Sequence, residues 1–150
     1  EEKLLQEIVA TIIPEGEIPG ARSLEVPNFV WVMIDDMLSD KKQKSFMNGL
    51  KLFDNKVKEV SGNSFIDLSE NDRLFVLKDI LDGKIKEDKP ENKKDLKNIR
   101  NFVKAAKYYA TWGYMQSEYI MTEIMPYQLI PGSYGSCETI ETNKRVNING

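Results

Sequence analysis

The sequence predicts an all-α protein, an irregular bundle of five or six helices with a turn-rich C-terminal tail. Apolar residues recur at spacings of three and four in several segments, which is the period of a helix that buries one face. No segment alternates convincingly between apolar and polar residues, and the nearest, 64–68, is short and isolated. A chain of 150 residues suits one domain, so we expect a single helical domain over 1–150, with 141–150 as a flexible tail.

Three helices are expected in the first 60 residues. The first covers 3–13 and ends at Pro14, where a loop rich in proline and glycine begins. The second opens near Pro27, which suits a first helical turn, and it is apolar around most of its circumference, which predicts a central helix. Ser39 or Asp40 can cap the third helix. The third helix has an apolar stripe formed by Phe46, Leu50, Phe53 and Val57.

A fourth helix is expected between Ser69 and Gly83. Ser69 is followed three residues later by an acidic residue, Asp72, which resembles a capping box, and Gly83 is a typical stop. The polar segment 84–95 contains Pro90 and is expected to be a solvated connector. In the helix between Ser69 and Gly83, the side chains that we expect to point inward are Leu74, Phe75, Leu77, Ile80 and Leu81.

A long helix follows the connector, with Phe102 and Tyr109 among the residues on its apolar face. We expect it to bend or stop near Gly113. Ser117 can then cap a last helix, which Pro126 closes.

Composition excludes several kinds of chemistry. The chain has no histidine and one cysteine, which removes Ser-His and Cys-His nucleophiles, an internal disulfide and a cysteine-rich metal site. A net charge of −3, spread along the chain, argues against a nucleic-acid partner. No run approaches the ~18 apolar residues of a membrane span. We therefore predict no catalytic, cofactor-binding or metal-ligating residue in this chain.

Two pairs of carboxylates are candidates for catalytic or metal-binding groups, and neither has suitable spacing. Asp35 and Asp36 are adjacent, and neighbours on a helix point about 100° apart, so they do not converge on one proton or metal. One of them is expected to help cap the next helix. Glu118 and Glu123 are five residues apart and share a helix face poorly.

The segment 105–137 has an unusual composition. It contains all six tyrosines, one of the two tryptophans and the single cysteine, Cys137, and it carries little charge. Tyrosine, tryptophan and methionine are enriched at the centres of protein interfaces, so the segment is either the aromatic half of the core or a surface that another protein covers. Phe102 and Tyr109 fit the core. The residues that we predict to contact a partner are Trp112, Tyr114, Tyr127, Pro131, Gly132, Tyr134 and Cys137.

Cys137 has three interpretations. A lone cysteine can be a small buried apolar residue, a free thiol, or half of a disulfide to another chain. Its neighbours are glycine and serine, which are poor core residues. The residues leave these alternatives open.

Two segments resemble a known family. Residues 4–29 read LLQEIVATIIPEGEIPGARSLEVPNF, a helix ending in TIIP, a loop with PGA, and V-P before an apolar helix. Residues 108–118 read YYATWGYMQSE, and 131–137 end in PG-x-Y-x-x-C, while FMNGLKLFD at 46–54 is compatible. In this order and spacing they are similar to the gluconate 2-dehydrogenase subunit 3 family.

The resemblance implies a small, noncatalytic accessory subunit of a membrane-associated sugar or sugar-acid dehydrogenase. In such complexes a large subunit of the glucose–methanol–choline oxidoreductase type carries FAD, and a haem-bearing cytochrome subunit is a further partner. The small subunit is expected to stabilise the flavoprotein and to accompany it to the periplasm through twin-arginine export. This chain begins at Glu1 without such a signal, and we expect a trimmed or mature form.

Two other functions remain as hypotheses. The chain could be a stand-alone periplasmic binding module, with its aromatic residues lining a pocket for a small ligand. It could also be a hydrolase or lyase that uses carboxylates alone. Activity or ligand-induced stabilisation of the isolated chain would favour one of these over the subunit.

Overall fold

The computed structural model describes residues 1–85 and 90–125, and every structural statement below refers to these ranges. Its α-helices are α1 (Glu2–Ile12), α2 (Val26–Met37), α3 (Asp40–Ser61), α4 (Glu70–Asp82) and α5 (Pro90–Met115). A 3₁₀ turn, η1 (Phe65–Asp67), precedes α4, and a short π-helix, η2 (Ile120–Ile124), follows α5. The described ranges contain no strand, so the all-α prediction is confirmed. The predicted tail at 141–150 lies outside them.

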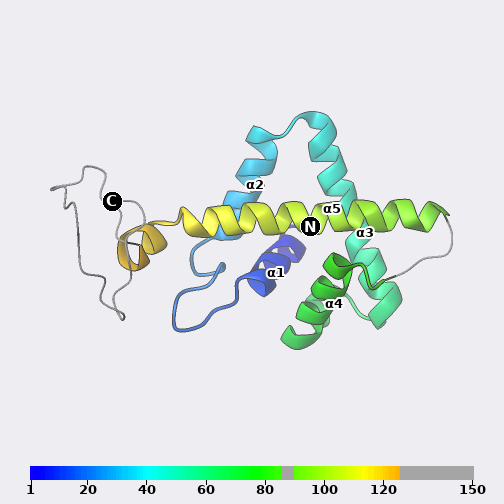
Figure 1. Ribbon diagram of the computed structural model, residues 1–150, viewed down its shortest axis with the longest axis horizontal. Helices are drawn as coiled ribbons and strands as arrows, with labels where there is room; N and C mark the ends of the chain where they lie inside the picture. The colour runs from blue at the N-terminus through cyan, green and yellow to red at the C-terminus, as the bar shows by residue number, and fades with distance from the viewer. Residues whose placement is uncertain (86–89, 126–150) are drawn as a thin grey trace, which may run out of the picture.

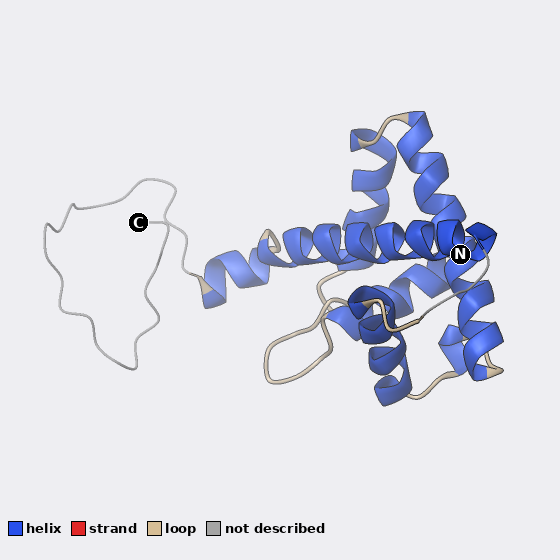
Figure 2. Ribbon diagram, turned by 45° about the vertical axis from the view of Figure 1, so that its right-hand side comes forward, coloured by secondary structure: helices blue, strands red, loops and turns tan. Residues whose placement is uncertain are grey.

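Helix α5 is the element around which the others pack. It runs along the long axis of the molecule, with α2 above it and α1 and α4 below it in the view of Figure 1. It contacts each of α1, α2, α3 and α4. The prediction that the second helix is central was wrong, because α2 leaves Val32 and Met37 more than half exposed. Figure 2 shows the same bundle from another side, with the long α1–α2 loop lying away from it.

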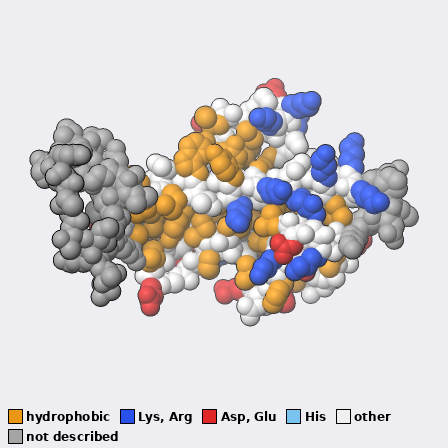
Figure 3. Space-filling view, viewed as in Figure 1, with side chains coloured by type: hydrophobic (Ala, Val, Ile, Leu, Met, Phe, Trp, Pro, Cys, Tyr) orange, Lys and Arg blue, Asp and Glu red, His pale blue; other side chains and the backbone are white. Residues whose placement is uncertain are grey.

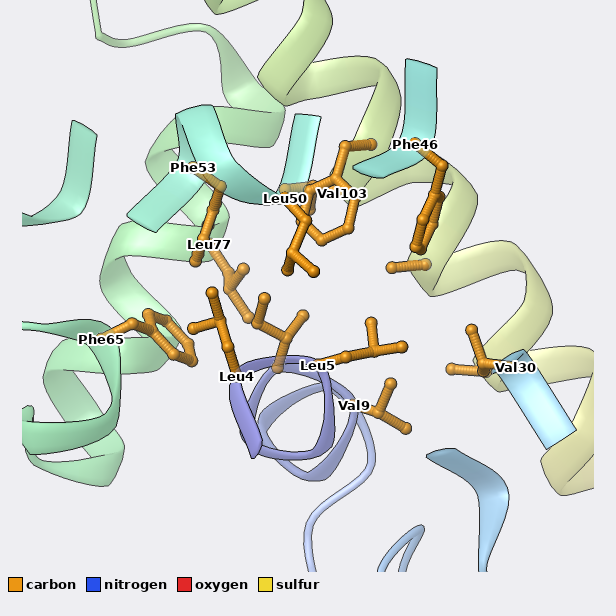
Figure 4. Packing of buried hydrophobic residues seen from close by; sticks show 14 of the residues in the cluster. Leu4, Leu5, Val9, Val30, Phe46, Leu50, Phe53, Phe65, Leu77 and Val103 are labelled. Atoms are coloured by element: carbon orange, nitrogen blue, oxygen red, sulfur yellow. The ribbon is translucent and has the colours of Figure 1, made fainter. Parts of the chain in front are cut away.

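The core lies where α1, α3 and α5 meet. The apolar stripes predicted for the first and third helices are buried, and Figure 4 shows Leu5 and Val9 of α1 on the side of the cluster near Val30, with Leu50 of α3 in its middle. Phe102, from α5, packs edge-on against Phe46 at 4.9 Å between ring centroids. Burying one such side chain stabilises the fold by roughly 1.5–3 kcal/mol. The same cluster also includes Leu4, Ile8, Val30, Val57, Phe65, Leu77, Ile99 and Val103.

Two glycines permit close helix crossings. A Cβ on Gly49 of α3 would lie 2.5 Å from the Cβ of Phe102, so only glycine lets α3 approach α5 at this point. A Cβ on Gly113 would overlap the ring of Phe29 from α2. The helix ends at Met115, close to the position expected near Gly113, but Gly113 itself lies within the helix and makes room for the crossing with α2.

Helix α4 corrects two other expectations. Leu77 and Ile80 are buried, as expected, but Leu74 is 53% exposed and Phe75 is 64% exposed. Four consecutive apolar residues cannot all face inward on a helix, and burial of Leu77 turns these two outward. The connector predicted at 84–95 is also too long, because α5 already begins at Pro90. Proline suits a first helical turn, where no N–H partner is required.

Helix ends follow the sequence signals only in part. Ser69 caps α4 as predicted, since its Oγ accepts the Asp72 N–H at 3.2 Å, and Gly83 ends the helix with φ +71°. Ser39 stands at the start of α3 without a side-chain cap.

Two other predictions assigned a cap to a side chain that does not form it. The turn between α2 and α3 is closed by Gln43, whose Nε2 donates to the Asp35 carbonyl at 2.6 Å, rather than by an Asp35 or Asp36 cap. Ser117 directly precedes the last helical segment, and its carbonyl accepts the Met121 N–H at 3.0 Å, but its side chain does not cap that segment, because its Oγ donates to the Tyr114 carbonyl at 2.7 Å.

Candidate functional site: an aromatic surface on helix α5

The second half of α5 carries a cluster of aromatic rings at the surface. The rings of Tyr108 and Trp112 are 6.2 Å apart between centroids, and Tyr109 lies 5.2 Å from Tyr108. Phe29 of α2 meets Trp112 edge-on at 5.9 Å. We call these four residues together with Met115 the aromatic surface. Tyr108 is 64% exposed, and Trp112 and Met115 are each 38% exposed.

Helical spacing explains why these side chains share one side of α5. Tyr108 and Trp112 are four residues apart, and Met115 follows three residues later, so they follow one another along one helix face. Tyr108 and Trp112 fall outside the helix face that the buried residues of α5 occupy. Their position along the helical repeat could therefore have predicted their exposure from the sequence. The residues of the buried stripe are Ile99, Phe102, Val103, Ala106 and Ala110.

A shallow hollow lies beside the aromatic surface, where α5 passes the end of α4. Its volume is ≈ 630 Å³, and most of its lining is apolar. Figure 3 shows hydrophobic side chains gathered toward the C-terminal end of α5. The residues that line the hollow are Leu81, Lys104, Lys107, Tyr108, Thr111, Trp112 and Met115.

The structure separates two of the contact residues predicted from the sequence. Trp112 belongs to the aromatic surface. Tyr114 is half-buried, and its hydroxyl donates to the Pro19 carbonyl at 3.1 Å, which ties α5 to the α1–α2 loop. The sequence prediction had not included Tyr108 or Met115. The other predicted contacts, Tyr127, Pro131, Gly132, Tyr134 and Cys137, lie outside the described residues and stay predictions.

The α1–α2 loop that Tyr114 holds is folded around one carboxylate. Glu15 accepts the Gly20 N–H at 2.6 Å, the Ser23 N–H at 3.0 Å and the Ser23 hydroxyl at 2.9 Å. These hydrogen bonds, led by the one from Gly20, hold the pKa of Glu15 below its ordinary value. A Cβ on Gly20 would lie 2.6 Å from the Pro14 carbonyl carbon, so this turn requires glycine.

The two sequence segments that carry the family resemblance are neighbours in space. The first contributes the loop and Phe29, and the second contributes Trp112, Gly113 and Tyr114. Phe29 packs over Gly113 and against Trp112, while Tyr114 binds the loop at Pro19. A single junction of α2, α5 and the loop therefore explains both patterns.

The acidic residues considered from the sequence lie apart from the aromatic surface or at the exposed surface of the described ranges. No three acidic or cysteine side chains there are placed to hold a metal ion. Asp35, Asp36, Glu118 and Glu123 are all exposed. The pKa of Lys84 is raised, first by Asp79 and then by Asp82, within a surface ion pair. What the described residues do offer is an apolar surface.

The protein is an all-α bundle in which the other α-helices pack against one long helix, α5. The α1–α2 loop joins α5 at the junction formed with α2. The family model described as gluconate 2-dehydrogenase subunit 3 matches residues 1–132, and the chain belongs to this family. The family is that of a subunit of a dehydrogenase complex. Tyr134 and Cys137 lie beyond the matched residues. No curated protein and no solved structure matches the chain.

None of the helices within 1–85 and 90–125 combines the length and the apolar character needed to cross a membrane.

Proposed function

We propose that this chain is the noncatalytic small subunit of a flavin-dependent dehydrogenase complex and that it binds and stabilises the large subunit. That large subunit carries FAD, is of the glucose–methanol–choline oxidoreductase type and oxidises a sugar or a sugar acid. One observation carries the proposal: a chain of this family exposes a cluster of large aromatic side chains on its longest helix.

The chemistry of the aromatic surface supports a protein partner. Tyrosine and tryptophan offer a large contact area with few rotatable bonds, and they dominate the binding energy of many interfaces. Tyr108 leaves about two thirds of its surface to solvent, 64%, beside the partly exposed Trp112 and Met115. A partner that covers them removes this apolar area from water, which favours association.

The wider assembly is part of the same proposal. Electrons from the flavin pass to a haem-bearing cytochrome subunit, and the small subunit escorts the folded flavoprotein to the periplasm by twin-arginine export. The continuous core of α1, α3 and α5 supports the escort role, because a subunit with its own core can fold before it meets its partner.

Co-purification tests the proposal directly. A tagged form of the chain is isolated from its own cells, and the eluate is analysed for flavin absorbance and for dye-linked oxidation of sugars and sugar acids. We expect a yellow flavoprotein in stoichiometric amount, with the activity in that subunit. A colourless, solitary chain would contradict the proposal and favour the stand-alone binding module.

The same eluate tests the predicted role of Cys137. On a non-reducing gel, a disulfide between the subunits would appear as a band that a reductant dissociates. A Cys137→Ser variant should lose this band and keep the flavoprotein, because the aromatic surface remains. An identical gel for both chains would show that Cys137 forms no bridge.

A further inference from the structure

The hollow beside the aromatic surface has a basic rim. Lys104 and Lys107 line it from α5, and both are exposed. Lys78, also exposed, lies one turn before Leu81 on α4, on the same side of that helix. Figure 3 shows Lys and Arg side chains spread over the face that α5 presents. Although the chain has a net charge of −3, three exposed lysines lie around or near this apolar hollow.

Within the part of the chain that the structure describes, Lys104 and Lys107 of this rim have no acidic partner. Among the described residues, the lining of the hollow contains no carboxylate. Within the described ranges, neither Lys104 nor Lys107 takes part in an ion pair, whereas Lys84 and Lys58 both do. Uncompensated charges at the edge of an apolar surface attract a partner of opposite sign and repel one of like sign.

We propose that the hollow receives a segment of the partner protein in which a large apolar side chain is flanked by carboxylates. The apolar side chain packs against Tyr108 and Trp112, and the carboxylates pair with Lys104 and Lys107. The identity of the partner rests on the proposed function, whereas the chemistry of the docked segment rests on the hollow and its rim alone.

The charges and the shape disfavour two other occupants. A second copy of this chain, docked through the same face about a two-fold axis, would place its lysine-rich rim against the lysines of the first copy. An anionic lipid surface would match the charge, and Tyr108 is exposed enough to reach it, but the larger Trp112 ring is not free to project into lipid. Here Trp112 is fixed edge-on against Phe29 at the wall of a hollow.

A defined peptide tests the chemistry without any knowledge of the partner. The probe is a blocked peptide with a Leu-Phe core and two glutamates on each side, and its control carries lysines in place of the glutamates. Each is titrated into the ¹⁵N-labelled full chain, and amide chemical shifts are followed. We expect the acidic peptide to shift the amides of 104–115, with a dissociation constant of order 1 mM or lower. The basic peptide should leave them unchanged.

Charge reversal locates the effect on the rim. The double variant Lys104→Glu/Lys107→Glu should bind the acidic peptide about tenfold more weakly than wild type does. It should also no longer prefer the acidic peptide to the basic one. The matched control, Lys41→Glu with Lys42→Glu, reverses two exposed lysines in the first turn of α3 and should leave binding unchanged. Equal shifts with both peptides, no shifts, or shifts centred elsewhere would overturn the proposal. Cosedimentation of the full chain with phosphatidylglycerol vesicles through the same two lysines would also overturn it, in favour of a membrane.

The co-purified flavoprotein separates this inference from the proposed function. The flavoprotein could bind wild type and the Lys104→Glu/Lys107→Glu variant equally, with no effect of salt on either affinity. In that case the proposed function stands, and the inference that an acidic segment docks in the hollow is refuted. If no flavoprotein is found while the acidic peptide binds as expected, the inference stands and the partner must be sought elsewhere.

Discussion

At the scale of the residue, Glu15 holds the α1–α2 loop with one carboxylate that accepts three hydrogen bonds. Because these bonds favour the charged form, the folded-state pKa of Glu15 lies below its ordinary value of 4.5. A depressed pKa means that the stabilisation is fully present above about pH 4.5 and is lost as the pH falls through the folded pKa.

The Glu15→Gln variant should therefore unfold at a lower temperature than wild type near neutral pH, with a difference that shrinks in acid. Thermal unfolding by circular dichroism across the range from about pH 7 down to about pH 3 measures this. The control is Glu17→Gln, in the same loop. A difference that stays constant with pH would show that the Glu15 charge does not hold the loop.

Gly49 is the residue that sets the separation of α3 and α5. Alanine usually stabilises a helix interior by about 1 kcal/mol over glycine. Here the new Cβ would meet the Phe102 Cβ at 2.5 Å, and an atom so close to the backbone cannot rotate away. We expect Gly49→Ala to lower the free energy of unfolding by about 1–3 kcal/mol in total.

Chemical denaturation of Gly49→Ala beside Gly16→Ala measures the effect. Gly16 has no atom within 4 Å of its added Cβ, so its variant should match wild type. A Gly49→Ala protein as stable as wild type would mean that the crossing has room to relax.

At the scale of the element, Glu7 links α1 to two other parts of the chain. Its carboxylate pairs with Arg73 of α4 and, at 2.8 Å, with Arg22 of the loop. Arg73 also donates through Nε to the Phe65 carbonyl at 3.1 Å, and it lies over the Phe65 ring. The Arg73 side chain is 15% exposed and the Arg22 side chain 52%, so the two ion pairs share one carboxylate but differ in solvation.

That difference predicts unequal costs for two matched substitutions. Arg73→Ala should lower the free energy of unfolding by about 2 kcal/mol, since it strands partly buried acceptors. Arg22→Ala should cost less than about 1 kcal/mol, as exposed pairs do. Urea denaturation measures both values. Equal costs would mean that α4 does not depend on Arg73 for its position against α1 and η1.

Local sequence patterns predicted helices well because a helix depends on contacts between near neighbours. The stripe from Phe46 to Val57, the Ser69 cap and the Gly83 stop were all readable for that reason. One misinterpreted residue depends on a partner far along the chain. Gly113 resembled a breaker because glycine is a poor helix former, but its role is to make room for the ring of Phe29.

The candidate site was predictable only in part. The unusual composition of 105–137 covers the segment that bears the exposed rings, and Trp112 is partly exposed there, while its contact with a partner stays a prediction. Tyr114 was grouped with it by residue type, and its bond to Pro19, 95 positions away along the chain, has no local signature. The hollow needed the three-dimensional structure, because Leu81 reaches it from another helix.

At the scale of the whole molecule, the long helix has two opposite roles. One side of α5 completes the core through Phe102, Val103 and Ala106, and the other carries Tyr108 and Trp112 at the surface. Because α5 contacts all four other α-helices, the position of the aromatic surface is fixed by the packing of the entire bundle. The proposed interface is thus preorganised, which lowers the entropic cost of binding.

The most direct test of the account is the affinity of the purified chain for its flavoprotein. Tyr108→Ala and Trp112→Ala are compared with Val60→Ala, which truncates an exposed apolar side chain on α3. We predict that each aromatic variant retains its helix content and weakens binding by about 2 kcal/mol, roughly thirtyfold, while Val60→Ala binds as wild type does. Undiminished affinity in both aromatic variants, or unfolding of the variants instead of loss of binding, would contradict the assignment of this surface as the docking site.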